Sequence, residues 1–318
     1  MNERRSWPRD LAVHGVFWRE CLDWAILHTP SFLHRFLIFI STLFFFFFAA
    51  PARRTTLRHL AIILPGSWRI ANYLRVFRIF QNFGWALADA AVHRLLRQPF
   101  TCELSGDKFL RELAASKGGI VLTAHMGNYD LGAAMFAETF DREMRMVRAP
   151  EPDAITAQHL DRWIEQAGAG AVKVDYNTEG MLLSFDLLSA LRRGEIISIQ
   201  GDRVIGEVAK SPVTLFGRTV LLPTGPFVLA LVSEAPIYPL FVIRSGYRRY
   251  KIVAHEPIIC VRSSESRDAV VAAAMQRWSG VLEDAISGYW PQWFALRRFF
   301  KTWRRHGVIK SMYQCRKA

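Results

Sequence analysis

The sequence predicts an α/β fold, with a mixed sheet flanked by helices and preceded by an N-terminal helical region that contacts a membrane. Two observations lead to this prediction. Short apolar runs alternate with helical patterns through the middle of the chain, as is typical of α/β domains. A strongly apolar segment and an arginine-rich stretch precede that middle part. We therefore expect a helical region over residues 1–100, an α/β domain over 101–290 and a basic aromatic tail over 291–318.

The composition is that of a folded protein with an unusual charge. The 318 residues are 51% hydrophobic and 22% charged, which excludes a disordered chain and allows a sizeable core. Lys and Arg number 41 against 28 Asp and Glu, and the net charge of +13 favours acidic partners. Because aromatic residues reach 13%, we expect the acidic partner to be a membrane surface and not a nucleic acid. The four cysteines have neither CxxC nor metal-ligand spacing, which predicts thiols in a reducing compartment (Cys21, Cys102, Cys260 and Cys315).

The apolar segment from Phe36 to Ala50 reads FLIFISTLFFFFFAA and carries no charge. A helix that crosses a bilayer needs about twenty residues, so the segment is short for a span. Three interpretations compete: a spanning helix with snorkelling arginines, a helix lying in the interface, and a core helix. The basic residues on both sides, Arg35 and Arg53, favour membrane contact. Whether the segment spans the membrane or lies on it stays open.

Two basic stretches flank the middle of the chain. Residues 53–97 hold eight arginines against one acidic residue, Asp89, and apolar side chains recur among them at helical spacing. We expect an amphipathic helix there. After Asp284 the chain has no acidic residue, and basic and aromatic side chains alternate to its end. Both stretches suit an anionic surface.

The middle of the chain divides into short elements. Apolar runs predict strands at 119–124, 143–148, 171–174, 196–200, 237–244 and 250–255, and a hairpin at 214–222. Helical patterns fall at 131–140, 154–167, 180–191, 225–232 and 264–286.

The candidate chemistry follows the first of these strands. The strand is expected to end at Ala124, and the chain turns through Gly127-Asn128 into a helix that begins near Asp130. Open α/β sheets bind ligands at the carboxyl ends of their strands, which is where His125 lies. Asp130, in the first helical turn, can accept a hydrogen bond from the imidazole. The pair predicts a general base acting on a substrate hydroxyl, with a hydrogen-bonded core histidine as the alternative.

This stretch, AHMGNYDLGA at residues 124–133, resembles the first block of the lysophospholipid and glycerolipid acyltransferase superfamily, which has His-X4-Asp spacing. It is more similar to the lipid A late-acyltransferase branch than to the glycerol-phosphate branch. Further blocks follow in the order of the superfamily. They are MVR at 146–148, QGDR at 200–203, TLFG at 214–217, LPTGP at 222–226, IYP at 237–239 and the aromatic-basic segment at 288–299.

The resemblance implies an enzyme that moves a fatty acyl chain from a thioester of acyl carrier protein or coenzyme A to a hydroxyl of a lipid or glycolipid, such as a lipid A precursor. In this interpretation His125 takes the acceptor's proton, and Asp130 orients His125 and stabilises the imidazolium. Backbone amides near Gly127 and Asn128, or the guanidinium of Arg203, are the expected donors to the developing oxyanion. No metal or redox cofactor is expected.

The resemblance also implies the remaining contacts and the location. Arg148 and Arg203 are expected to hold a phosphate or another anionic part of the acceptor or donor. Asp202 is expected to support one of these arginines or to position its loop. The expected location is the cytoplasmic face of a bacterial inner membrane, where the basic stretches dock on anionic lipid or on acidic acyl carrier protein.

Other functions stay open at this point. Asp202 stands where the glycerolipid branch has glutamate, so another envelope lipid, of the ornithine or polyene type, is an alternative acceptor. A catalytically silent membrane adaptor with the same fold would carry the same blocks. We expect no nucleic acid as a partner, because binding to it would leave the segment 36–50 and the spacing of His125 and Asp130 unexplained.

Overall fold

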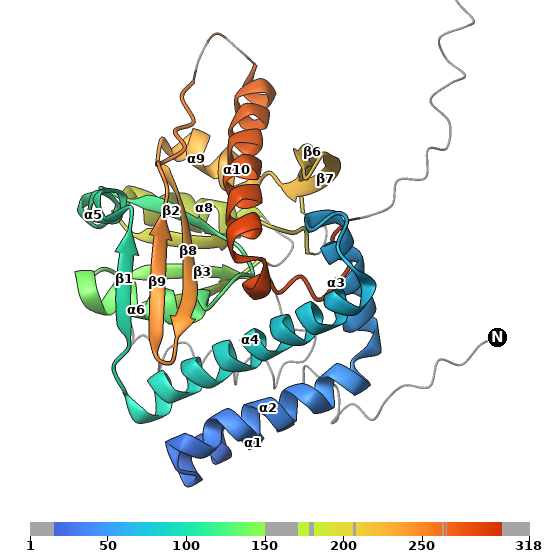
Figure 1. Ribbon diagram of the computed structural model, residues 1–318. Coiled ribbons are helices and arrows are strands. Elements are labelled where there is room, and N and C mark those ends of the chain that lie inside the picture. The colour runs from blue at the N-terminus through green and yellow to red at the C-terminus, as the bar shows by residue number, and fades with distance from the viewer. Residues whose placement is uncertain are drawn as a thin grey trace, which may run out of the picture.

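The computed structural model describes residues 16–149, 171–177, 181–205, 208–262, 264 and 266–300. A seven-stranded sheet forms the centre of this part of the chain, and helices cover both of its faces (Figure 1). The α/β class with a mixed sheet is therefore confirmed. The helix predicted at 154–167 lies outside the described residues.

The sheet has the strand order β1-β9-β8-β2-β5-β3-β4. Every neighbouring pair is parallel except β8 and β9, which form an antiparallel hairpin. Parallel strands with both faces covered are apolar throughout, and all five residues of β2 are buried. The strands are β1 (Thr101–Ser105), β2 (Gly119–Thr123), β3 (Met144–Arg148), β4 (Val172–Tyr176), β5 (Ile196–Gln200), β8 (Ile237–Gly246) and β9 (Arg249–Ala254).

Three helices pack on each face of the sheet, and a separate hairpin packs against one of them. One core cluster joins the sheet to α4, α5 and α6, and the other joins it to α8, α9 and α10. The hairpin of β6 (Lys210–Leu215) and β7 (Arg218–Pro223) contacts α10, where the Thr214 carbonyl accepts a hydrogen bond from Ser279 at 2.6 Å. The helices are α5 (Asp107–Ala115), α6 (Tyr129–Phe140), α8 (Met181–Arg192), α9 (Gly225–Ser233) and α10 (Arg267–Tyr289).

Within residues 16–100, four helices precede the sheet, and the longest of them, α4, links the other three to it. The expected amphipathic helix over 53–97 is two helices, because the chain breaks at Pro65-Gly66. α4 runs along the sheet and α2 lies beside α4, farther from the sheet (Figure 1). Gly84 allows this approach, since a Cβ there would lie 3.2 Å from Ile38 of α2. The helices are α1 (Val16–His28), α2 (Ser31–Phe48), α3 (Ala50–Ile63) and α4 (Arg69–Leu96).

Two regions differ from the sequence predictions. β1 and α5 were not predicted, because β1 is a half-exposed edge strand whose residues TCELS lack an apolar run. The first ten residues of the predicted tail, 291–300, begin within the short 3-10 helix η2 (Trp290–Gln292) and run back into the protein. There Trp293 and Phe300 are buried in the core, beside the end of β2.

Candidate active site

His125 lies in the turn between β2 and α6, at the carboxyl edge of the sheet. The turn is held from two sides. Gly127 N donates to Gln292 O at 2.9 Å, and Asn128 N donates to Val242 O at 2.9 Å. Gly127 has φ +60°, and a Cβ there would lie 1.8 Å from Val242 O, so only glycine fits. The backbone that carries His125 is therefore fixed between β8 and η2.

The imidazole of His125 pairs with Asp202. Its Nδ1 lies 2.7 Å from Asp202 Oδ1, and the Asp202 side chain is fully buried. The sheet register explains the contact, because Thr123 of β2 pairs with Gln200 of β5. His125 lies two residues after Thr123, and Asp202 lies two residues after Gln200. The segments that follow β2 and β5 therefore place these two side chains next to each other. Trp293 Nε1 donates to the other carboxylate oxygen at 3.3 Å.

The charges around the pair favour a neutral imidazole beside an ionised carboxylate. Burial alone would raise the pKa of Asp202, but the charges of His125 and Arg203 and the hydrogen bonds to the carboxylate hold that pKa well below its usual range. Burial lowers the pKa of His125, and the attraction of Asp202 offsets this only in part. An ionised carboxylate only accepts hydrogen bonds, so Nδ1 carries the proton and Nε2 keeps a lone pair.

The predicted contact between Asp130 and His125 is not the one that forms. Asp130 Oδ1 accepts a hydrogen bond from Arg148 Nη1 at 2.7 Å. Asp130 is the second residue of α6, and Arg148 is the last residue of β3. A permanent cation at that strand end is a stronger partner for a carboxylate than a neutral imidazole is. The correction is that Asp202, and not Asp130, orients His125.

The predicted oxyanion donors differ in whether they are available to a substrate. The backbone amides of Gly127 and Asn128 both donate to carbonyl oxygens within the protein, so neither is available to a substrate. Arg203 Nη2 donates to Phe294 O at 3.2 Å and lies 3.5 Å from Asp202, so the predicted support of an arginine by Asp202 is a weak contact. Arg203 Nε is buried without a hydrogen-bond partner among the described residues. Of the two kinds of donor predicted, only Arg203 stays a candidate, because its side chain is 16% exposed.

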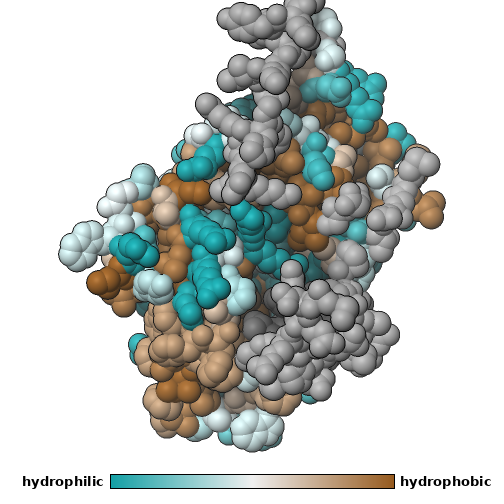
Figure 2. Space-filling view, turned by 90° about the vertical axis from the view of Figure 1, so that its right-hand side faces the viewer, coloured by the Kyte–Doolittle hydropathy of each residue, from teal (hydrophilic) through white to brown (hydrophobic). Residues whose placement is uncertain are grey.

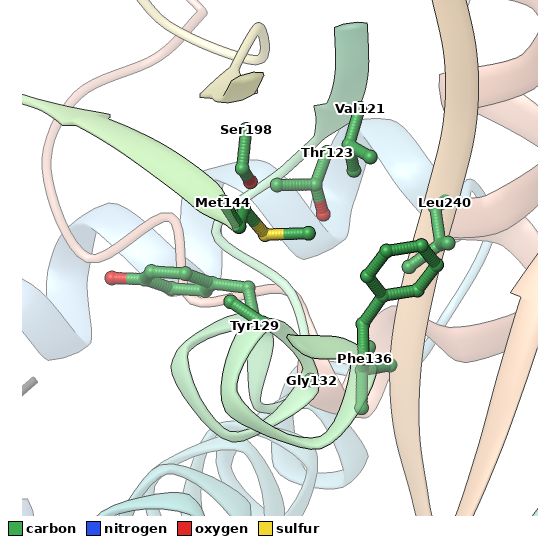
Figure 3. Close-up of a pocket in the computed structure, with 10 residues that line it drawn as sticks. Val121, Thr123, Tyr129, Gly132, Phe136, Met144, Ser198 and Leu240 are labelled. Carbon is green, nitrogen blue, oxygen red and sulfur yellow. The ribbon is translucent and has the colours of Figure 1, made fainter. Parts of the chain in front are cut away.

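A pocket of about 20 Å³ lies between α6 and the sheet (Figure 3), and His125 is near it but is not part of its lining. Thr123 and Met144 from the sheet and Phe136 from α6 point into the same space. Tyr129 lines the pocket, and its ring centroid lies 6.0 Å from that of His125. Most of the lining is apolar, which suits a hydrocarbon chain. The other lining residues are Val121, Gly132, Ala133, Ser198, Leu240 and Val242.

Comparison with protein families identifies the chain. The family model described as bacterial lipid A biosynthesis acyltransferase matches residues 15–302. The chain belongs to this family. No curated protein sequence in the comparison matches it. The match covers the helices α1 to α4 and the sheet. As the sequence resemblance implied, the family therefore accounts for most of the length of this acyltransferase.

Within this acyltransferase, sequence reasoning found His125 but missed two of the residues around it. Trp293 and Gln292 were seen only as members of an aromatic-basic tail, and nothing in their spacing indicated contact with the site. Asp202 was expected beside an arginine, and it does contact Arg203, but its shorter contact with His125 was not predicted. A signal was present, because Asp202 follows its strand by two residues, as His125 follows β2. Among the described residues, no three His, Cys, Asp or Glu side chains are grouped as a metal site would require.

Proposed function

We propose that this acyltransferase moves a fatty acyl chain from an acyl thioester, on acyl carrier protein or coenzyme A, to a hydroxyl of a lipid A precursor, with His125 as the general base. The contact of 2.7 Å between His125 and Asp202 carries the proposal, because it leaves a neutral Nε2 lone pair beside a pocket. The family supplies the reaction class, and the pair supplies the group that starts the reaction.

In the proposed step, Nε2 of His125 takes the proton of the acceptor hydroxyl as its oxygen attacks the thioester carbonyl. Asp202 holds the ring and stabilises the imidazolium that forms. The tetrahedral intermediate then collapses, the carbon–sulfur bond breaks, and the imidazolium returns its proton to the leaving thiolate. The products are the ester and the free thiol, and the step needs no metal or redox cofactor.

Arg203 is the proposed electrostatic partner of this step. Its side chain is 16% exposed, so part of it is open to a ligand. A guanidinium there would stabilise the oxyanion or an anionic group of the substrate. Arg148, held by Asp130 at the edge of the same site, is proposed to bind an anionic part of acceptor or donor.

The pocket under α6 has a volume of about 20 Å³, so in this structure it is the proposed seat of only the first methylene groups of the acyl chain. It begins beside Tyr129, next to His125, and continues between Phe136 of α6 and Met144 and Leu240 of the sheet. A chain seated there would bring its carbonyl carbon toward Nε2 while its methylene groups leave water.

The N-terminal helices form the proposed membrane surface. α2 is long and apolar enough to cross a membrane by length and composition, and only 17% of it is buried. Large apolar side chains are exposed on α1, α2 and the start of α4, where Trp24, Phe36, Phe47, Trp68 and Leu74 are each more than half exposed. Figure 2 shows apolar residues gathered over the lower part of the molecule, where α2 lies in Figure 1. An apolar surface of this extent with arginines around it fits anionic lipid.

We propose that α2 lies in the interface and does not span the bilayer. Ile38 and Thr42 of α2 are buried against Gly84 of α4, so the two helices move together. α4 carries Arg75 and Arg78, which are costly to place in hydrocarbon. A helix lying at the surface keeps these arginines near lipid headgroups. The proposed location is the cytoplasmic face of a bacterial inner membrane.

The reaction is tested with the purified full chain in vesicles that contain a lipid A precursor, supplied with acyl–acyl carrier protein or acyl-coenzyme A. We expect mass spectrometry to show the acceptor gaining one acyl chain. The same preparation of His125→Ala is expected to show no gain. Activity in the His125→Ala variant would show that His125 is not the general base. Acylation of a different envelope lipid in cellular extracts would show that the acceptor is not a lipid A precursor.

The position of α2 is tested by cysteines placed singly at Phe32 and Phe48, near its two ends, in a variant without other cysteines. A membrane-impermeant maleimide is expected to label both positions from the same side of sealed vesicles. Labelling of the two positions from opposite sides would mean that α2 spans the bilayer.

A further inference from the structure

A buried polar cluster joins α4 to the turn that carries His125, and the proposed chemistry does not use it. Its members are Asp89 of α4, Tyr250 of β9, Arg244 of β8 and Asn128 of the turn. Asp89, Tyr250 and Asn128 are each less than 5% exposed. Buried polar groups at such a junction are costly unless each of them has a partner, so their contacts are informative.

The carboxylate of Asp89 is the centre of the cluster. Its Oδ2 accepts hydrogen bonds from Tyr250 Oη at 2.7 Å and from Arg244 Nε at 2.9 Å. The guanidinium of Arg244 also lies over the ring of Trp85, one turn earlier on α4, with its carbon 4.3 Å from the ring centroid. Asp89 is the only acidic residue between residues 53 and 97, so no other carboxylate of α4 makes these contacts.

The Tyr250 hydroxyl connects Asp89 to Asn128, because it also accepts a hydrogen bond from the Asn128 amide. Asn128 Nδ2 donates to Tyr250 Oη at 3.3 Å and to Ala86 O of α4 at 2.9 Å. With both amide hydrogens directed at α4 and β9, Asn128 Oδ1 faces the other way and accepts from Leu131 N at 3.3 Å. This last bond caps α6. The orientation of the cap is therefore set by α4, directly at Ala86 and through Tyr250 at Asp89.

We propose that Asp89 and Tyr250 are positioning residues, which hold the Asn128 amide and with it the first turn of α6 beside His125. The inference rests on the proposed function, because that turn carries Tyr129, at the mouth of the acyl pocket, and Asp130, the partner of Arg148. Loss of the tyrosine hydroxyl leaves the amide held only by Ala86 O and Leu131 N, so the start of α6 is fixed less firmly.

The test is Tyr250→Phe, which keeps the buried ring and the ion pair of Asp89 with Arg244. We expect kcat/KM for the thioester to fall about tenfold, the effect of one buried hydrogen bond. The matched control is Tyr238→Phe. Tyr238 is also a buried tyrosine, but its hydroxyl donates to Glu112 of α5 at 3.0 Å and not to the turn that carries His125. We expect its kcat/KM to match that of the wild type.

A double-mutant cycle separates positioning from general stability. If Tyr250 acts through Asn128, Tyr250→Phe has less than a twofold effect in an Asn128→Ala background. An equal loss in both backgrounds, or an equal loss in Tyr238→Phe, would overturn the proposal. Should Tyr250→Phe fail to fold, Asn128→Asp tests the same link, because its carboxylate still accepts from Leu131 N but can no longer donate to Tyr250 or to Ala86 O.

Hydrogen exchange gives a readout that does not depend on activity. We expect Tyr250→Phe to lower the protection of amides at 129–133, where Leu131 N is capped, and Tyr238→Phe to leave it unchanged. Unchanged protection in Tyr250→Phe would overturn the positioning role even if the wild type transfers acyl chains. An inactive wild type with the expected exchange pattern would instead contradict the proposed function alone.

Discussion

The two charged pairs of the site differ in where they lie and in what they can do. Asp202 is fully buried and meets a histidine, while Asp130 is 31% exposed and meets an arginine. The buried pair contains an imidazole, which can take up and release a proton, and the second pair contains a guanidinium, which binds anions. The first pair is therefore suited to proton transfer, and the second to the proposed binding of an anionic substrate. Each prediction below tests this division.

The largest effect is expected from Asp202→Asn. The amide no longer stabilises the imidazolium and can hold His125 in the wrong tautomer, so kcat should fall by about 10²- to 10⁴-fold. Steady-state rates on vesicles measure this, with circular dichroism to show that the fold is kept. A variant within threefold of the wild type would contradict the orienting role of Asp202.

A smaller effect on a different parameter is expected from Asp130→Asn. Arg148 keeps its charge but loses a carboxylate at 2.7 Å, so the guanidinium is held less firmly. We expect the KM for one substrate to rise by about three- to tenfold, with a lesser change in kcat. If Asp130→Asn reduces kcat as much as Asp202→Asn does, the division between the two pairs is wrong.

The pH dependence of kcat/KM tests whether His125 is the group that transfers the proton. His125 must be neutral to act as a base, and burial lowers its pKa, so the acidic limb of kcat/KM is expected below the ordinary histidine value of 6.5. The positive charge of Arg203 also lowers the pKa of His125. Arg203→Ala should therefore move the limb to higher pH, whereas Asp202→Asn, which removes an attraction for the imidazolium, should move it lower. An unmoved limb in both variants would mean that His125 is not the titrating group.

The smallest effect is expected from Trp293→Phe. The substitution removes one hydrogen bond of 3.3 Å to Asp202, while the bond from His125 remains. We expect kcat to fall less than tenfold. Trp290→Phe is the control, because it changes the same segment three residues earlier and leaves the Trp293 indole in place. Equal losses in the two variants would point to general damage to the segment.

The sequence predicted the elements of the sheet better than the partners within the site. Apolar runs such as 119–124 and 196–200 fell within a residue of β2 and β5, because buried parallel strands leave a continuous signal. The neighbour in the chain, Asp130, was chosen over Asp202 because no sequence pattern states which strands are adjacent. Tyr250 and Trp293 were out of reach for the same reason: their roles depend on register and on the return of η2, which are properties of the folded chain.

The length of α4 has a consequence for the reaction as a whole. A helix of 28 residues is about 42 Å long, and here one rod ends in exposed apolar side chains while its other half holds the polar cluster beside the catalytic turn. With α2 in its proposed place at the membrane surface, α4 lies between α2 and the sheet, so a layer about one helix thick, about 10 Å, separates the sheet from the lipid. We expect such an enzyme to acylate a sugar hydroxyl that projects from the bilayer to the height of His125.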